Sequence, residues 1–162
     1  MEIADLISRI GGRRHAFSGV FYDGAAPMGG YEFRSEFEFL RTEEALEIEG
    51  GIVTRAGAVP VPFSLIWAFS SIRLHGAHSC RLRSPQLGEV TGPLVTFGEG
   101  FSYLGVNASG VSCSVQILFT SYHVFEIHGM VRHPARTFAF RAAHTSQWEQ
   151  VAKAKVLSMH RK

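Results

Sequence analysis

The stretch that decides the fold is Tyr31-Glu32-Phe33-Arg34-Ser35-Glu36-Phe37-Glu38-Phe39. Its odd positions carry aromatic side chains and one serine, whereas every even position carries a charge. Successive side chains of a β-strand point to opposite faces of the sheet, so this alternation predicts a strand with one apolar and one solvated face. A helix, with 3.6 residues per turn, would scatter the phenylalanines around its axis.

The same alternation recurs on both sides of this stretch. It begins at Arg14, and the first strand is expected to carry Phe17, Gly19 and Phe21 on one face. Further strands are predicted over residues 45–54, 59–69, 72–82, 94–97, 101–106, 111–119, 122–131 and 137–142. Turn residues separate them, as in Asn107-Ala108-Ser109-Gly110, for which a hairpin turn is preferred to a glycosylation site.

About nine or ten short strands with short connections are typical of a β-sandwich or an up-and-down barrel, and not of βαβ units. Closure into a barrel removes free sheet edges, and a chain that is nearly all meander closes naturally. We therefore predict an all-β fold, an antiparallel up-and-down barrel, and keep a sandwich as the alternative.

Two helices are expected to flank the strands. Ile3, Leu6, Ile7 and Ile10 form one helical stripe, which predicts a short helix over 3–10 that covers one end of the barrel. A capping box at 146–149 predicts a second helix over 146–159. The 162 residues are expected to form a single domain, 1–162, with the barrel over 14–143.

Composition and the absence of certain sequence motifs limit the classes of partner, location and cofactor that are expected. The formal net charge of +2 gives no broad positive field, so nucleic acid is not expected as a partner. The chain starts Met1-Glu2-Ile3-Ala4-Asp5, without a secretory signal, and a cytoplasmic location is expected. No run of about 18 apolar residues occurs, so no membrane span is predicted. Dinucleotide-binding, P-loop and nucleophile-elbow motifs are absent, and no cofactor is expected.

The strand layout resembles the calycin class, which comprises lipocalin-like and fatty-acid-binding-like barrels. The resemblance covers most of the chain as a strand pattern, but Ser18-Gly19-Val20-Phe21 stands where lipocalins have a Gly-x-Trp signature. Arg141 is similar in position to the basic residue that such barrels often keep near the end of the last strand. The resemblance implies a lumen that holds a small apolar molecule, and it transfers no site residue.

Two histidines are candidates for acid–base catalysis. His78 and His123 both fall on the faces interpreted as inward, where an apolar lumen disfavours the charged imidazole and leaves a base usable near neutral pH. A core histidine hydrogen-bonded to a neighbour is the simpler alternative. Glu126 and His128 share the opposite face of the same strand and are expected to form an exposed pair.

No metal site is predicted. The chain has 8 histidines but no His-x-His pair, and only residues two apart share a strand face, so no local chelate forms. A metal or haem site assembled from distant strands is the alternative. Cys80 and Cys113 are interpreted as reduced core residues, with a catalytic thiol as the alternative.

The inward faces supply the expected ligand-binding residues. They are Tyr31, Phe33, Ser35, Phe37, Phe63, Trp67, Cys80, Tyr103 and Phe125. The sequence thus favours binding of a small hydrophobic or aromatic molecule in the lumen. Two alternatives remain: a cofactor-independent cyclase or isomerase on the same pocket, and a haem-binding, purely structural or homodimeric barrel.

Overall fold

The computed structural model describes residues 2–24, 30–42, 45–54, 61–74, 77–85 and 87–145. The helix predicted over 146–159 lies outside the described residues. Helix α1 spans Ile3–Ile10. The strands are β1 (Arg13–Asp23), β2 (Tyr31–Arg41), β3 (Ala45–Thr54), β4 (Val61–Leu74), β5 (Ala77–Ser84), β6 (Gly88–Phe97), β7 (Gly100–Val106), β8 (Ser112–Phe119), β9 (Phe125–His133) and β10 (Arg136–His144).

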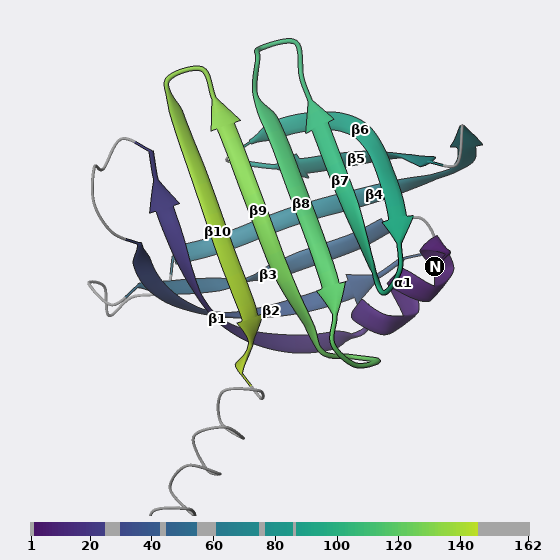
Figure 1. Ribbon diagram of the computed structural model, residues 1–162, viewed down its shortest axis with the longest axis horizontal. Helices are drawn as coiled ribbons and strands as arrows, with labels where there is room; N and C mark the ends of the chain where they lie inside the picture. Colours follow the sequence, from purple (N-terminus) through teal and green to yellow (C-terminus); the bar gives the residue numbers. More distant parts are fainter. Residues whose placement is uncertain are drawn as a thin grey trace, which may run out of the picture.

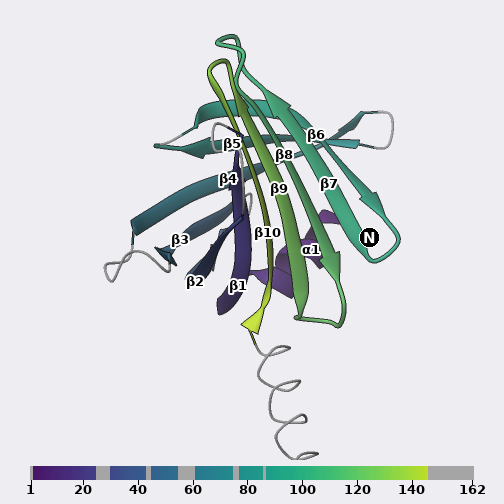
Figure 2. The same ribbon diagram turned by 60° about the vertical axis from the view of Figure 1, so that its left-hand side comes forward.

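These strands form a closed barrel in sequence order, as the all-β prediction expects (Figure 1). Each strand pairs antiparallel with its neighbour along the chain, and β10 returns to pair antiparallel with β1, where Phe17 faces His144 and Phe21 faces Phe140. Figure 2 shows β1 beside β10 at this closure. The sandwich alternative is therefore wrong.

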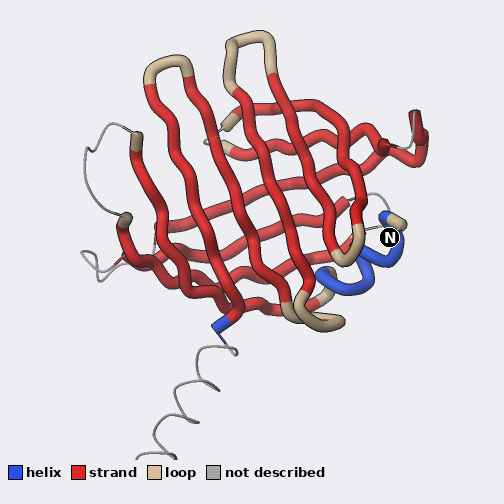
Figure 3. Tube along the Cα trace, viewed as in Figure 1, coloured by secondary structure: helices blue, strands red, loops and turns tan. Residues whose placement is uncertain are grey.

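Helix α1 covers one end of the barrel, the end at which β1 begins and β10 finishes (Figure 3). Its side chains Leu6, Ile7 and Ile10 belong to the hydrophobic core, and Ile3 packs against that core. The four residues are the stripe expected from the sequence. We call this end of the barrel the α1 end, and the opposite end, where β1 turns into β2, the far end.

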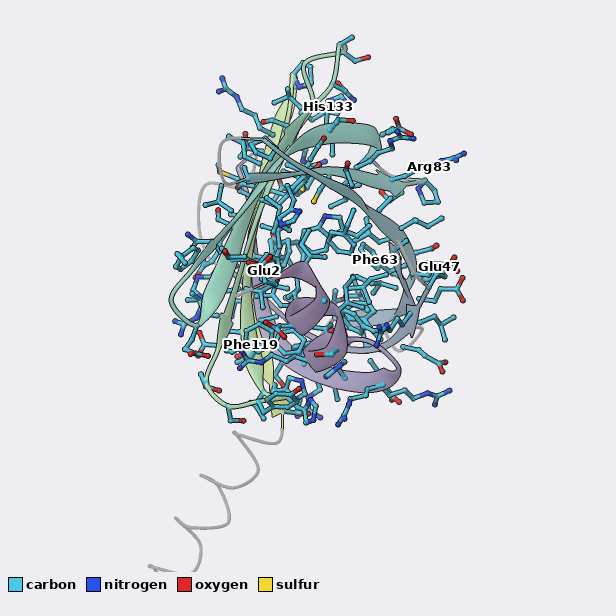
Figure 4. The ribbon with its side chains drawn as sticks, turned by 90° about the vertical axis from the view of Figure 1, so that its right-hand side faces the viewer. Glu2, Glu47, Phe63, Arg83, Phe119 and His133 are labelled. Carbon is cyan, nitrogen blue, oxygen red and sulfur yellow. The ribbon has the colours of Figure 1, made fainter. Side chains whose placement is uncertain are left out.

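The inward and outward faces of β2 match the alternation from which the fold was predicted. Phe33, Ser35 and Phe39 are buried, whereas Arg34 and Glu36 are exposed. Figure 4 looks onto α1 and shows the same division elsewhere, with Phe63 inside the ring of strands and Glu47 and Arg83 directed outward.

Several strand boundaries differ from the sequence predictions. The range 72–82 contains the end of β4 and the start of β5, with a register shift between Phe69 and Arg73. The segment between the strands predicted over 72–82 and 94–97 contains the start of β6. Pro93 lies opposite Ser79 of β5, and the pairing of β6 with β7 is interrupted between Thr91 and Leu94. The N–H group that proline lacks therefore falls at a gap in the β6–β7 ladder.

The hairpin predicted at 107–110 is present between β7 and β8. The Asn107 Oδ1 atom accepts hydrogen bonds from the backbone N–H groups of Ser109 and Val111, each at 3.0 Å. Gly110 closes the turn at a φ of 79°, a conformation that favours glycine. Within the described residues, no helix is long and apolar enough to cross a membrane.

Candidate functional site in the barrel lumen

The lumen changes character from one end to the other. At the α1 end, Phe17 and Phe125 are 0% exposed, and their ring centroids lie 5.4 Å apart in an aromatic floor. Toward the far end, Phe21, Phe63 and similar inward-facing side chains are only partly buried, although strands surround them on all sides. Water-sized space therefore borders the inner wall in this part of the barrel.

Inward-facing glycines let aromatic rings lie along the wall. A Cβ atom at Gly50 would come within 2.6 Å of a ring carbon of Phe37, and one at Gly19 within 2.8 Å of a ring carbon of Phe33. A Cβ atom at Gly129 would collide with the ring of Phe140. Each ring thus covers a glycine, so these aromatic side chains line the lumen wall.

Three buried polar atoms on the inner wall have no hydrogen-bond partner in the described part of the chain: Ser35 Oγ, Trp67 Nε1 and His78 Nε2. They come from β2, β4 and β5. Leaving a buried polar group unsatisfied costs about 1–3 kcal/mol, so each of these atoms calls for a partner that the described residues do not supply.

The structure places His78 at the lumen but not His123. His78 lies on the inward face of β5, and its Nδ1 atom is 3.4 Å from the carbonyl oxygen of Ser70. The sequence predicts a strand at His123, but this residue lies in the loop before β9, where its Nδ1 atom donates to the carbonyl oxygen of Arg9 at 3.0 Å. The assignment of His123 to an inward strand face is wrong, because β9 begins only at Phe125.

Most of the expected ligand-binding residues line the inner wall. They are Phe33, Ser35, Phe37, Phe63, Trp67, Cys80, Tyr103 and Phe125. Tyr31 differs: it is 48% exposed at the far end, where its ring stacks on Phe21 with centroids 5.0 Å apart. Strand alternation gives the face of Tyr31 but not its position at the rim.

Two polar residues among the expected ligand-binding residues, Tyr103 and Cys80, are either already hydrogen-bonded within the protein or chemically unreactive. The Tyr103 hydroxyl donates to the carbonyl oxygen of Val90 at 2.9 Å, so it does not reach into the lumen for a ligand. Burial raises the pKa of the Cys80 thiol to about 12 and that of Cys113 to about 11. Both cysteines are free and buried, and a protonated thiol is a poor nucleophile.

The sequence reasoning missed a pair of histidines in the floor of the lumen. His15 Nδ1 lies 2.8 Å from His144 Nε2, and His15 Nε2 lies 2.8 Å from the carbonyl oxygen of Ile10. A carbonyl only accepts, so His15 donates from Nε2, and its Nδ1 then accepts the proton of His144 Nε2. Both residues alternate in phase with inward phenylalanines, but only the closure of β1 on β10 brings them together.

The pair is held in its neutral form. Burial, and to a lesser extent the neighbouring His15, lower the pKa of His144 to about 4. Burial also lowers the pKa of His15, against the opposing effect of its hydrogen bond to Ile10. The rings of Phe17 and Phe125 enclose the pair, with centroids 4.9 and 5.2 Å from that of His144.

The outer wall carries the expected pair of Glu126 and His128, whose side chains are 3.3 Å apart. Arg141 joins them at 2.9 Å and therefore points away from the lumen. Partial burial raises the pKa of Glu126, but hydrogen bonds from Arg141 and His128 outweigh it and lower the pKa overall.

Among the described residues, no group of His, Cys, Asp or Glu side chains is placed to hold a metal ion. Haem binding and catalysis by His78 stay predictions.

The fold has a counterpart among solved structures. The S-type phycobiliprotein lyase CPES from Guillardia theta superimposes with a TM-score of 0.68 over 89% of this chain and 92% of the lyase, at 10% sequence identity. The barrel is calycin-like. The structure of EF1p2_mFAP2b bound to DFHBI has a TM-score of 0.42 and 8% identity over 88% of this chain and 98% of that one. No family model and no curated protein matches the sequence.

Proposed function

We propose that this protein binds a small hydrophobic or aromatic molecule in the lumen of its barrel. The observation that carries the proposal is the half-buried aromatic wall toward the far end. Phe21, Phe37 and Phe63 point inward in a closed barrel and still border water-sized space. A small barrel that its own side chains do not fill has room for one small ligand.

A purely structural barrel fits these features less well. Such a barrel would bury its inward side chains at both ends, as this one does at the α1 end with Phe17, Phe101 and Phe125. It would also gain stability by replacing Ser35 and Trp67 with apolar side chains, since their polar atoms have no partner in the described residues. A ligand that occupies the lumen explains both features.

The lyase that shares the fold acts, by its name, on phycobiliproteins. At 10% identity that likeness supports a barrel suited to small molecules and does not specify the molecule. The ligand class proposed for this chain follows from its own lumen, which is lined mainly by phenylalanine.

The proposal is tested with the neutral, environment-sensitive dye Prodan and two neighbouring positions of β9. Val131 faces the lumen near the far end, and Met130 points outward with 47% of its surface exposed. We expect Prodan to bind in a 1:1 ratio. Val131→Phe should weaken binding at least about tenfold because the added ring takes up lumen volume, which corresponds to about 1.4 kcal/mol.

Met130→Phe is the matched control, because it introduces the same ring on the outer wall. It should leave the dissociation constant within about twofold of the wild-type value, a change of about 0.4 kcal/mol. Circular dichroism of both variants establishes that each keeps its strands. Saturable binding that responds equally to both substitutions, or no binding at all, would contradict a site in the lumen.

A further inference from the structure

We infer that the lumen ligand carries a hydrogen-bond acceptor, such as a carbonyl oxygen, on an aromatic or conjugated skeleton, and that this acceptor receives the indole N–H of Trp67. The inference rests on the proposed function and deepens it, because it turns a general apolar pocket into one that selects a chemical class.

Trp67 is the residue from which the need for a hydrogen-bond acceptor follows. Its side chain points inward from β4 and is 2% exposed, and its Nε1 atom is buried without a partner in the described residues. An indole nitrogen donates a hydrogen bond and does not accept one. The missing partner must therefore be an acceptor.

Among the described residues, the side chains around the indole supply no such acceptor. Phe69 and Phe101 contact the ring with centroids 5.5 and 5.4 Å away, and both are hydrocarbons. Tyr103 lies edge-on at 5.6 Å, but its hydroxyl is turned to the carbonyl oxygen of Val90. The three rings form an apolar surface around a single N–H group, which is the typical composition of a site that fixes the orientation of a flat molecule.

Two further atoms indicate that the ligand is not a plain hydrocarbon. His78 Nδ1 faces the carbonyl oxygen of Ser70 and so carries the proton, which leaves the Nε2 atom as a buried acceptor. Ser35 Oγ, from the β2 wall, both donates and accepts. An alkyl chain would leave all three atoms unsatisfied, whereas a carbonyl compound satisfies Trp67 directly.

The test uses two planar molecules that differ in one group. Fluorenone and fluorene share the same tricyclic shape, and only fluorenone has a carbonyl oxygen. Their affinities are measured by displacement of Prodan. We expect the wild-type protein to prefer fluorenone at least about tenfold, because only fluorenone gives the desolvated N–H group its acceptor.

Trp67→Phe removes the N–H group and keeps an aromatic ring. In this variant the preference should fall to within about twofold, through a loss of fluorenone affinity, while fluorene binds as before; twofold corresponds to about 0.4 kcal/mol. Tyr22→Phe is the control, since it removes a hydroxyl from an aromatic side chain that is 53% exposed on the outer wall, away from the lumen. That variant should keep the preference for fluorenone.

A spectroscopic measurement reports on the bond itself. The chain has 2 tryptophans, so the Trp148→Phe variant has a single indole N–H resonance, that of Trp67. Fluorenone should shift the proton of this resonance downfield, as hydrogen bonding does, and fluorene should not. A downfield shift with fluorene as well would mean that ring contact, and not an acceptor, causes the change.

The possible results distinguish a failure of this inference from a failure of the proposed function. If neither molecule displaces Prodan and Prodan itself does not bind, the proposed function fails and the inference fails with it. If both molecules bind with equal affinity, the lumen binds apolar ligands but Trp67 selects no acceptor, so the inference alone is overturned. A preference for fluorenone that survives Trp67→Phe also overturns it.

Discussion

His15 and His144 form a buried hydrogen bond between two neutral imidazoles, and this makes them the most pH-sensitive feature at the scale of single residues. The pKa of His144 is lowered to about 4 and that of His15 is lowered as well, both chiefly by burial. Arg13 and His123 also disfavour a charge on His15. Protonation therefore favours the unfolded chain, where a histidine has a pKa of about 6.5.

The sign of the pH effect follows from proton binding. Between pH 6.5 and about 4 the unfolded state binds more protons than the folded state, so the free energy of unfolding should fall as the pH is lowered through this window. His144→Gln keeps an N–H group that can donate to His15 and removes one titrating site. Urea denaturation from pH 4 to 7.5 should show a flatter profile for this variant.

His133→Gln is the comparison for that experiment, because His133 is exposed at the end of β9 next to the β9–β10 hairpin (Figure 4). Its profile should follow that of the wild-type protein. Equal flattening in both variants would show that general charge, and not the buried pair, sets the pH dependence.

At the scale of elements, Arg9 adds polar contacts to the apolar packing by which Leu6, Ile7 and Ile10 attach α1 to the barrel. The guanidinium of Arg9 donates to the carbonyl oxygens of Tyr122 and Ser121 at 3.0 and 3.2 Å, in the loop between β8 and β9. It also lies 3.8 Å from the ring centroid of Phe119 and 3.2 Å from Glu99. These contacts hold the helix against two loops of the α1 end.

Arg9→Met should therefore loosen α1. The variant keeps an apolar stem but loses every donor, and charge-assisted hydrogen bonds of this kind contribute about 1.5–3 kcal/mol each. We expect a loss of about 2 kcal/mol or more in the free energy of unfolding, measured in urea, together with faster hydrogen exchange of the α1 amides.

Glu99→Gln tests whether the ion pair or the carbonyl contacts hold the helix. The Glu99 side chain is 78% exposed, and an exposed ion pair contributes little, so this variant should change stability by less than about 0.5 kcal/mol. A loss as large as that of Arg9→Met would assign the attachment to the ion pair instead.

At the scale of the whole molecule, side chains fill the barrel at the α1 end. Toward the far end they form a wall that borders water-sized space. A ligand that binds only this folded lumen must stabilise the entire barrel by mass action. At a free Prodan concentration of 100 times its dissociation constant, the free energy of unfolding should rise by about 2.7 kcal/mol. A much smaller rise, with the dye site saturated, would show that Prodan also binds the unfolded chain.

Much of the fold can be predicted from local pattern. The alternation from Tyr31 to Phe39 predicts the inward face of β2, and the stripe of Leu6, Ile7 and Ile10 predicts the buried face of α1, because both depend only on the repeat of the backbone. The same alternation predicts that Trp67 and His78 face the lumen. Strand ends are less predictable, as His123 shows, because a loop residue can continue the alternation of the strand that follows it.

The face of each residue, and with it an aromatic lumen, therefore follows from local sequence pattern. The tertiary structure decided the height of each residue along the barrel and its neighbours across the closure. Tyr31 is at the rim, Trp67 is left without an acceptor, and His15 meets His144 across 129 positions of chain. The physical reason is that alternation is a local property of the backbone, whereas strand register and the pairing of β1 with β10 depend on all the strands at once.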